Sequence, residues 1–255
     1  MTTFDFQDGQ GPVPAHRHEN PDGSEGGWVA ETASVEDTCF VGEDAKVFGK
    51  AQVSGRAWVS GNVRVFEDAR VEDNARVSGN AHVGGDAQVS GRAWVSGNAQ
   101  VWGDAKVYGN ANVWGDAKVY GNAVIAGNAR VLGKAVVTGH AKVSDHAKVG
   151  DNAKVFGHAQ VSDDARVYGK TQVWGDAKVY GNAVIAGNAW VSGNVWIFEN
   201  AKVEDNAKVF GDAKIFGNAQ VCGKAKVGGE VGVFGEVEIS TGTYQGDEWV
   251  REVPT

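Results

Sequence analysis

The stretch AKVFGKAQVSGRAWVSGN, residues 45–62, decides the fold of this chain. It contains three consecutive six-residue units of the form small, x, aliphatic, x, turn, turn. The same frame runs from Gly27 to Gly242 as 36 units, with no insertion or deletion. A short fixed period of this kind indicates a repeat architecture, in which each unit buries its apolar face against its neighbours.

Each position of the unit has a physical reason. The first position is Ala in 29 units, and the third is Val in 31 and Ile in five. Residues two apart in a strand point the same way, so these positions predict a strand of about four residues with an apolar inner face. The fifth position is Gly in 25 units and acidic in all but one of the rest, and the sixth is mostly Asn, Asp, Lys, Arg or His. Gly followed by Asn or Asp tolerates left-handed backbone, which predicts a corner.

A corner every six residues predicts an all-β fold that turns continually. Three strands close a triangle, so one coil takes 18 residues and the 36 units form about 12 coils of a three-sided parallel β-helix without loop insertions. A helix is excluded, because apolar residues recur at i, i+2, i+6 and i+8, and because Gly every six residues would interrupt it.

The pattern [Val/Ile]-x-Gly-[Asn/Asp]-Ala-x resembles the hexapeptide repeat of left-handed parallel β-helix proteins, which include bacterial acyltransferases and γ-class carbonic anhydrases. The resemblance covers residues 27–242, about 85% of the chain. It is this resemblance that implies the left hand, since general rules favour right-handed crossovers. The start at Gly26-Gly27-Trp28-Val29 and the loop-free coils also resemble YdcK-like hexapeptide proteins of bacteria and phages.

Three segments follow from the frame. Residues 1–26 lack the repeat and are predicted to be an irregular leader that covers the first coil as a cap. Residues 27–242 are predicted to be the β-helix. Residues 243–255 carry Tyr244, Trp249 and Val250 and are predicted to be a cap or a tail. Exposed strand edges at the ends of a solenoid invite polymerisation, which is the reason to expect caps.

Charge and composition limit the partners. The net charge is −8 and the pI about 5.3, which argues against nucleic acid, because such binding depends on neutralising phosphates with Lys and Arg. No signal peptide is recognised at the N-terminus, and no apolar stretch is long enough for a membrane span. We therefore expect a cytoplasmic protein or, as the alternative, a component of a phage virion, with no membrane contact.

Aromatic side chains occupy outward positions throughout the repeat. Counting every third unit assigns them to three faces, and the first face is the densest. Large exposed apolar surfaces tend to mark interfaces, although ladders of rings also stabilise stacked strands and can bind sugars or nucleic-acid bases. The candidate interface or binding residues on the first face are Phe48, Phe66, Trp102, Tyr120, Phe156, Trp174 and Phe210.

Histidines are the candidates for chemistry. His82 projects from a strand of the first face and is a weak candidate for the general base of an acyl transfer. His140, His146 and His158 stand at the sixth, corner position and are weak candidates for metal ligands, because zinc needs three close ligands. The spacing of five that the resemblance to γ-class carbonic anhydrases would imply is replaced here by spacings of six and twelve. We expect solvated corner histidines, no metal and no cofactor.

These observations favour a non-catalytic β-solenoid that acts as a structural, binding or self-assembly element. The alternatives are an acetyl-CoA-dependent hexapeptide acyltransferase and a carbohydrate- or nucleotide-binding scaffold. A homo-oligomer is expected, and the resemblance implies a trimer. The ligand would be a polymer or a small molecule.

Overall fold

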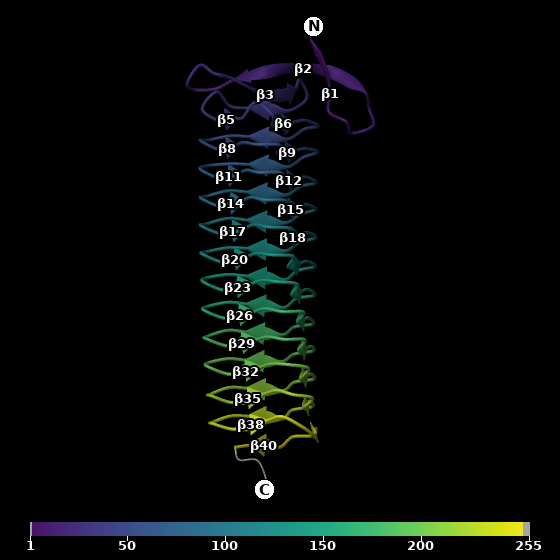
Figure 1. The fold of residues 1–255 in the computed structure, drawn as a ribbon, viewed down its shortest axis with the longest axis vertical. Helices are drawn as coiled ribbons and strands as arrows, with labels where there is room; N and C mark the ends of the chain where they lie inside the picture. Colours follow the sequence, from purple (N-terminus) through teal and green to yellow (C-terminus); the bar gives the residue numbers. More distant parts are fainter. Residues whose placement is uncertain (1, 252–255) are drawn as a thin grey trace. The chain divides into compact units, whose positions relative to one another are not determined.

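The computed structural model describes residues 2–251, and every regular element in that range is a β-strand. None of the described residues forms a helix long and apolar enough to cross a membrane. The chain divides into two compact units, residues 1–127 and 128–255. In both units, the strands of the repeat form three parallel sheets (Figure 1). Within the repeat, partner residues on neighbouring strands are 18 positions apart. This confirms the prediction of an all-β solenoid with about 12 coils of 18 residues.

The first unit contains β1 to β19. Its first sheet contains β1 (Thr3–Asp5), β2 (Pro12–Glu19), β3 (Glu25–Ala30), β6 (Lys46–Val47), β9 (Arg64–Val65), β12 (His82–Val83), β15 (Gln100–Val101) and β18 (Lys118–Val119). The second contains β4 (Ser34–Val35), β7 (Gln52–Val53), β10 (Arg70–Val71), β13 (Gln88–Val89), β16 (Lys106–Val107) and β19 (Val124–Ile125). The third contains β5 (Phe40–Val41), β8 (Trp58–Val59), β11 (Arg76–Val77), β14 (Trp94–Val95) and β17 (Asn112–Val113).

The second unit contains β20 to β40. Its first sheet contains β21 (Val136–Val137), β24 (Lys154–Val155), β27 (Gln172–Val173), β30 (Trp190–Val191), β33 (Lys208–Val209), β36 (Lys226–Val227) and β39 (Thr243–Tyr244). The second contains β22 (Lys142–Val143), β25 (Gln160–Val161), β28 (Lys178–Val179), β31 (Trp196–Ile197), β34 (Lys214–Ile215), β37 (Gly232–Val233) and β40 (Trp249–Val250). The third contains β20 (Arg130–Val131), β23 (Lys148–Val149), β26 (Arg166–Val167), β29 (Val184–Ile185), β32 (Lys202–Val203), β35 (Gln220–Val221) and β38 (Glu238–Ile239).

The core of each unit is made of the first and third positions of the repeat. Ala45 and Val47 in the first unit, and Ala153 and Val155 in the second, are fully buried. The side chains between and after them point outward. Small and β-branched residues suit this interior, because three inner faces meet there and only short side chains can be packed without strain.

From β4 to β40 the strands are two residues long, which corrects the prediction of about four. The backbone hydrogen bonding nevertheless extends along the whole six-residue unit. The amides of Lys46, Phe48 and Lys50 donate to carbonyls of the next coil at distances of 2.9, 3.0 and 2.7 Å. Their acceptors are Val63, Val65 and Glu67. The corner therefore hydrogen-bonds to the next coil as the strand does, although only two residues per side have extended pairing.

From Gly49 to Gly235, the fifth position of the repeat takes the left-handed conformation at the corners, as predicted. Gly49 has a φ of 71°, and Asp73, which replaces Gly at this position, has a φ of 61°. The Asp73 carboxylate accepts the amide of Gly91 in the next coil at 2.9 Å. The same contact recurs at the other acidic fifth positions with positive φ, which are Glu67, Asp145, Asp151, Asp163, Glu199 and Asp205. This hydrogen bond offsets the strain that a side chain adds to left-handed backbone.

The sixth position is not left-handed, which corrects one part of the corner prediction. None of the described Asn residues has a positive φ. Asn at this position instead forms ladders along a corner: Asn62 donates to Asn80, Asn80 to Asn98, and Asn98 to Asp116, at 3.3, 3.0 and 2.8 Å. The preference for Asn here therefore comes from side chains that are stacked 18 residues apart.

The N-terminal segment contains strands, which corrects the expectation of an irregular leader. β2 pairs antiparallel with β1 and with β3, so it covers the outer edge of the first sheet. Two buried side chains then complete the edge of the third sheet. His18 Nε2 donates to the Cys39 carbonyl at 3.0 Å, and the Val41 amide donates to Asn20 Oδ1 at 2.8 Å. This segment thus satisfies backbone groups of the first coil, as a cap must.

The coil continues beyond Gly242. β39 pairs with β36 and β40 with β37, both parallel, and the partner spacing falls from 18 to 17 residues. The repeat therefore loses one residue near Thr241 and Gly242 but keeps its fold to Val250. The predicted cap or tail at 243–255 is thus solenoid over its first part, while residues 252–255 lie outside the described range.

Candidate functional site

The predicted first-face aromatics are not one exposed strip. In the first unit, Phe48 is only 5% exposed, because Phe6 of the N-terminal segment stacks on it with ring centroids 4.9 Å apart. Phe66 leans over Gly84, where an added Cβ would lie 2.5 Å from its ring. Trp102 and Tyr120 are each 39% exposed. The first-face aromatics of this unit that are open to solvent are therefore Trp102 and Tyr120.

In the second unit, the rings of Phe156, Trp174 and Phe210 on the first face are half-buried. Phe156 and Trp174 stack at 5.5 Å with an interplanar angle of 4°, and Trp174 meets Trp190 edge-on at 5.8 Å. Phe210 lies over Gly228, where an added Cβ would be 2.2 Å from the ring. Here the aromatic side chains stabilise the stack of coils.

The longest ladder of parallel rings lies on the second sheet of the second unit. Tyr180, Phe198, Phe216 and Phe234 stack at centroid distances of 5.0, 5.0 and 5.3 Å, and Trp249 packs edge-on against the last two. Their spacing matches the distance between paired strands, so each ring covers the next. Tyr180, Phe198, Phe216 and Phe234 occupy outward positions of the repeat, as its frame predicts, but the pattern does not predict that their rings form a continuous ladder.

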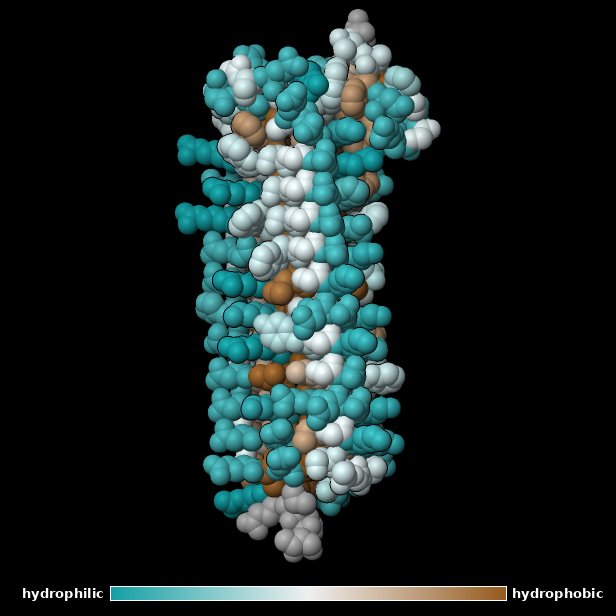
Figure 2. Space-filling model, viewed as in Figure 1, coloured by the Kyte–Doolittle hydropathy of each residue, from teal (hydrophilic) through white to brown (hydrophobic). Residues whose placement is uncertain are grey.

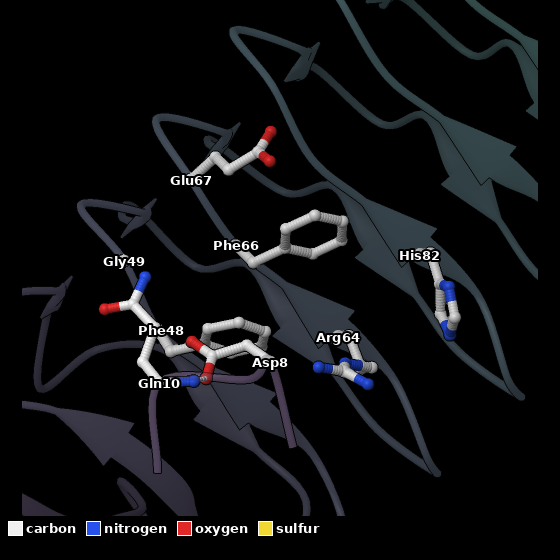
Figure 3. A pocket seen from close by; sticks show the side chains of 8 residues that line it. All are labelled: Asp8, Gln10, Phe48, Gly49, Arg64, Phe66, Glu67 and His82. Carbon is white, nitrogen blue, oxygen red and sulfur yellow. Dashed lines mark hydrogen bonds between the residues drawn. The ribbon is translucent and has the colours of Figure 1, made fainter. Parts of the chain in front are cut away.

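A cavity of about 390 Å³ lies between the N-terminal segment and the first sheet of the first unit. Figure 3 shows the rings of Phe48 and Phe66 in it, with Arg64 and His82 along the neighbouring column of the same sheet. Asp8, Gln10, Gly49 and Glu67 complete the lining. Asp8 and His82, which are 74 positions apart in the sequence, thus line the same cavity.

Arg64 holds the N-terminal segment against the sheet. Its Nη2 donates to the Phe6 carbonyl at 2.9 Å, and its guanidinium lies over the Phe48 ring at 5.0 Å. The Glu67 carboxylate accepts the Gly85 amide at 2.6 Å. Both groups therefore have structural roles at the cavity, beyond any role toward a ligand.

His82 projects outward from its strand and lines this cavity. Burial lowers the pKa of its imidazole, and the positive charge of Arg64, its register partner on β9, lowers the pKa further. The ring is therefore neutral at neutral pH and can accept a proton or a hydrogen bond. Among the described residues, no carboxylate forms a hydrogen bond to the ring, as an orienting group for a general base would.

The corner histidines lie along the corners of the second unit and are stacked or paired with polar neighbours. His140 and His158 stack at 4.8 Å with an interplanar angle of 3°, and His146 Nε2 lies 3.3 Å from Asn128 Nδ2. Within residues 2–251, no three His, Cys, Asp or Glu side chains are grouped so that they could hold a metal ion. All three histidines are exposed at corners.

Another open feature lies on the third sheet of the first unit, where Trp58 and Trp94 flank Arg76. The two tryptophans are 46% and 50% exposed and, with Ser60 and Ser78, line a cleft of about 320 Å³. Both tryptophans occupy outward positions of the repeat, as its frame predicts, but the pattern alone does not distinguish them from the denser aromatics of the first face. The usable signal was the pairing of Trp at the second position with Ser at the fourth.

A family model of a β-solenoid repeat matches three segments of the chain. The model of the YdcK β-solenoid repeat matches residues 87–103, 159–175 and 177–193. No curated protein matches the sequence.

Solved structures with some likeness include UDP-N-acetylglucosamine acyltransferases. The Arabidopsis enzyme is 13% identical with a TM-score of 0.36, covering 74% of this chain and 65% of its own. The Francisella novicida enzyme is 15% identical with a TM-score of 0.24, covering 80% of this chain and 61% of its own. This chain thus spans less than two thirds of either, and such scores carry no argument about its activity. In its repeat, the chain is similar to the YdcK β-solenoid proteins, as the hexapeptide pattern predicted.

Proposed function

We propose that this chain is a non-catalytic β-solenoid that acts as a binding and self-assembly element, in the cytoplasm or in a phage particle. The observation that carries the proposal is the exposure of Trp102 and Tyr120 on the first sheet of the first unit, at 39% each. Figure 2 shows one face of the molecule, where hydrophilic side chains dominate. On a surface of that kind, large aromatic side chains open to solvent mark a place where another molecule is bound.

The proposed assembly is a homotrimer that buries Trp102 and Tyr120 between copies. The two residues occupy equivalent positions, because each directly follows one of the paired strands β15 and β18. Trp102 touches its own chain edge-on, with the Phe66 ring at 6.4 Å. Aromatic residues bury about 150–250 Å² each, so the pair can anchor an interface whose rim is polar.

The test is sedimentation of the double variant Trp102→Glu with Tyr120→Glu. We expect wild type to sediment as a trimer at micromolar concentration and the variant as a monomer, because buried carboxylates cannot be paired there. Tyr108→Glu is the matched control, since Tyr108 is 43% exposed at the same repeat position on the second sheet. A monomeric wild type would contradict the assembly. Trp174 is a poorer choice for substitution, because its ring is half-buried in stacking contacts.

The second candidate is an acetyl-CoA-dependent acyl transfer at His82. It is favoured by one observation: a half-buried, neutral imidazole lines a cavity that also holds Arg64. If this reaction occurs, wild type releases CoA from acetyl-CoA in the presence of an acceptor hydroxyl and His82→Gln does not. The non-catalytic proposal expects no release from either protein.

A further inference from the structure

The third sheet of the first unit carries a surface with an unusual composition. At the second position of the repeat, β5, β8, β11, β14 and β17 present Phe40, Trp58, Arg76, Trp94 and Asn112. At the fourth position, the same coils present Gly42, Ser60, Ser78, Ser96 and Trp114. In these two columns, Arg76 is the single charged side chain. The surface therefore combines flat rings, hydroxyl groups and one cation.

The two central tryptophans are held in place before any ligand arrives. Trp58 stacks on Phe40 with centroids 3.8 Å apart and an interplanar angle of 10°. Trp94 Nε1 donates to Ser78 Oγ at 3.1 Å. Each ring nevertheless keeps about half of its surface open, at 46% and 50%. Rings that are fixed in this way lose little conformational entropy on binding, which favours affinity.

Arg76 lies between them without a partner. Its register partners are Trp58 on one side and Trp94 on the other. Within residues 2–251, its guanidinium forms no ion pair and no hydrogen bond, and it lies over neither ring. Its side chain is exposed. A free guanidinium presents a planar set of donors that matches a carboxylate.

The exposed Trp190 and the half-buried Trp196 differ in this respect. In the second unit, Lys208 Nζ lies 4.7 Å above the Trp190 ring, and Lys178 and Lys214 lie 4.6 and 5.9 Å from Trp196. Those cations cover the ring faces. On the third sheet of the first unit, Arg76 stands between the two rings and lies over neither of them, so the exposed part of each ring and the charge are available to one ligand.

We propose that Trp58, Arg76 and Trp94 form a binding site for an extended acidic polysaccharide, one whose sugar rings carry carboxylates. The two tryptophans are two strand spacings apart, about 9.5 Å, so a single sugar ring cannot cover both and a chain of linked rings can. Their indole faces stack on the apolar faces of the sugars, Arg76 binds a carboxylate between them, and Ser60 and Ser78 bind hydroxyls.

Single-stranded nucleic acid is the competing ligand, because its bases also stack on aromatic rings. Its affinity depends on several cations that neutralise successive phosphates, and this surface offers one in a chain of net charge −8. The observations therefore favour the polysaccharide. The site lies on a different sheet from Trp102 and Tyr120, so neither this proposal nor the proposed self-association depends on the other.

The test is a calorimetric titration of the protein with a β-1,4-linked mannuronate hexamer. Mannohexaose, which has a hydroxymethyl group in place of each carboxylate, is the matched neutral ligand. We expect saturable binding of the mannuronate, weakened at least tenfold by Trp94→Ala or Trp58→Ala. Arg76→Gln should weaken it about tenfold and leave the weaker binding of mannohexaose unchanged.

Trp190→Ala is the control variant, since Trp190 is 42% exposed but lies on the first sheet of the second unit. It should bind as wild type does. Trp94→Tyr should retain most of the affinity, which separates loss of stacking from loss of folding. The proposal is overturned if the mannuronate does not bind at millimolar concentration, if Trp94→Ala binds it as wild type does, or if Arg76→Gln weakens both sugars equally. It is also overturned if an oligothymidylate binds more tightly through the same residues.

Discussion

At the scale of the residue, the fifth position of the repeat must adopt a positive φ and must also leave room for the backbone of the next coil. A Cβ added to Gly49 would lie 2.7 Å from the amide nitrogen of Glu67 in the next coil, and the φ of Gly49 is positive. Glycine meets both demands at once. Acidic residues are tolerated because their carboxylate bonds to the amide of the next coil, as Glu67 does to Gly85. The preference for Gly at the fifth position thus results both from the turn and from the close stacking of the coils.

Thr171 replaces Ala at an inner position of the second unit and should cost stability. It is fully buried, and among the described residues its Oγ1 has no hydrogen-bond partner. Thr171→Val keeps the shape and removes the buried hydroxyl, so we expect a gain of about 1–2 kcal/mol in the free energy of unfolding. Thr138→Val, at an outward position, is the control and should change little. Urea denaturation measures both, and a loss of stability in Thr171→Val would show that the hydroxyl has a partner.

His82 should make the stability of the protein depend on pH. Because burial and Arg64 lower its pKa in the folded state, the unfolded chain takes up the proton first as the pH falls. Stability is therefore complete above the ordinary pKa of 6.5 and declines below it, until the folded imidazole is protonated as well. We expect the loss of stability between pH 7 and pH 5 to be smaller in His82→Gln. Equal pH profiles of unfolding for the two proteins would contradict this.

At the scale of the element, the N-terminal segment completes a coil that cannot complete itself. β2 supplies backbone partners to β3, whereas the third sheet receives side-chain partners from His18 and Asn20. The first coil of a solenoid has no preceding coil, so its outward-facing backbone groups need such substitutes. Phe6, packed on Phe48, secures the segment through apolar burial.

Asn20→Ala should open the edge of the third sheet. The Val41 amide would lose its acceptor, and its hydrogen exchange should accelerate at least tenfold, because only local opening is then required. Amides in the second unit, such as that of Val155, should exchange as in wild type. Unchanged exchange at Val41 would mean that another group accepts this amide. Exchange is measured by NMR or by mass spectrometry of peptides.

At the scale of the whole molecule, the self-association and the net charge act against each other. With a charge of −8, copies repel one another at low ionic strength, whereas burial of Trp102 and Tyr120 is apolar and insensitive to salt. The proposed trimer should therefore strengthen as salt rises from low to physiological concentration. Binding of an acidic polysaccharide at Arg76 should weaken over the same range, because added ions screen that charge pair. The two proposed activities can thus be separated in one salt series.

The sequence by itself determined the coil. The period of six, the Ala and Val columns and the Gly at the corner are local features, repeated 36 times, so a single extended pairing pattern satisfies all of them. It also placed His82 and the aromatics on the outside correctly, because alternation along a strand decides which side a residue faces.

The tertiary structure alone decided which outward-facing side chains are exposed to solvent and free to contact another molecule. Phe48 is covered by Phe6, Phe66 by its own lean over Gly84, and His82 and Asp8 meet in a cavity although 74 positions separate them. Contacts between coils also fix the orientation of two exposed rings. Trp58 stacks on Phe40, and Trp94 donates a hydrogen bond to Ser78. Such contacts depend on ring orientation and on how the end segment folds back, which a repeat pattern does not encode, because every unit of the pattern is alike while its surroundings are not.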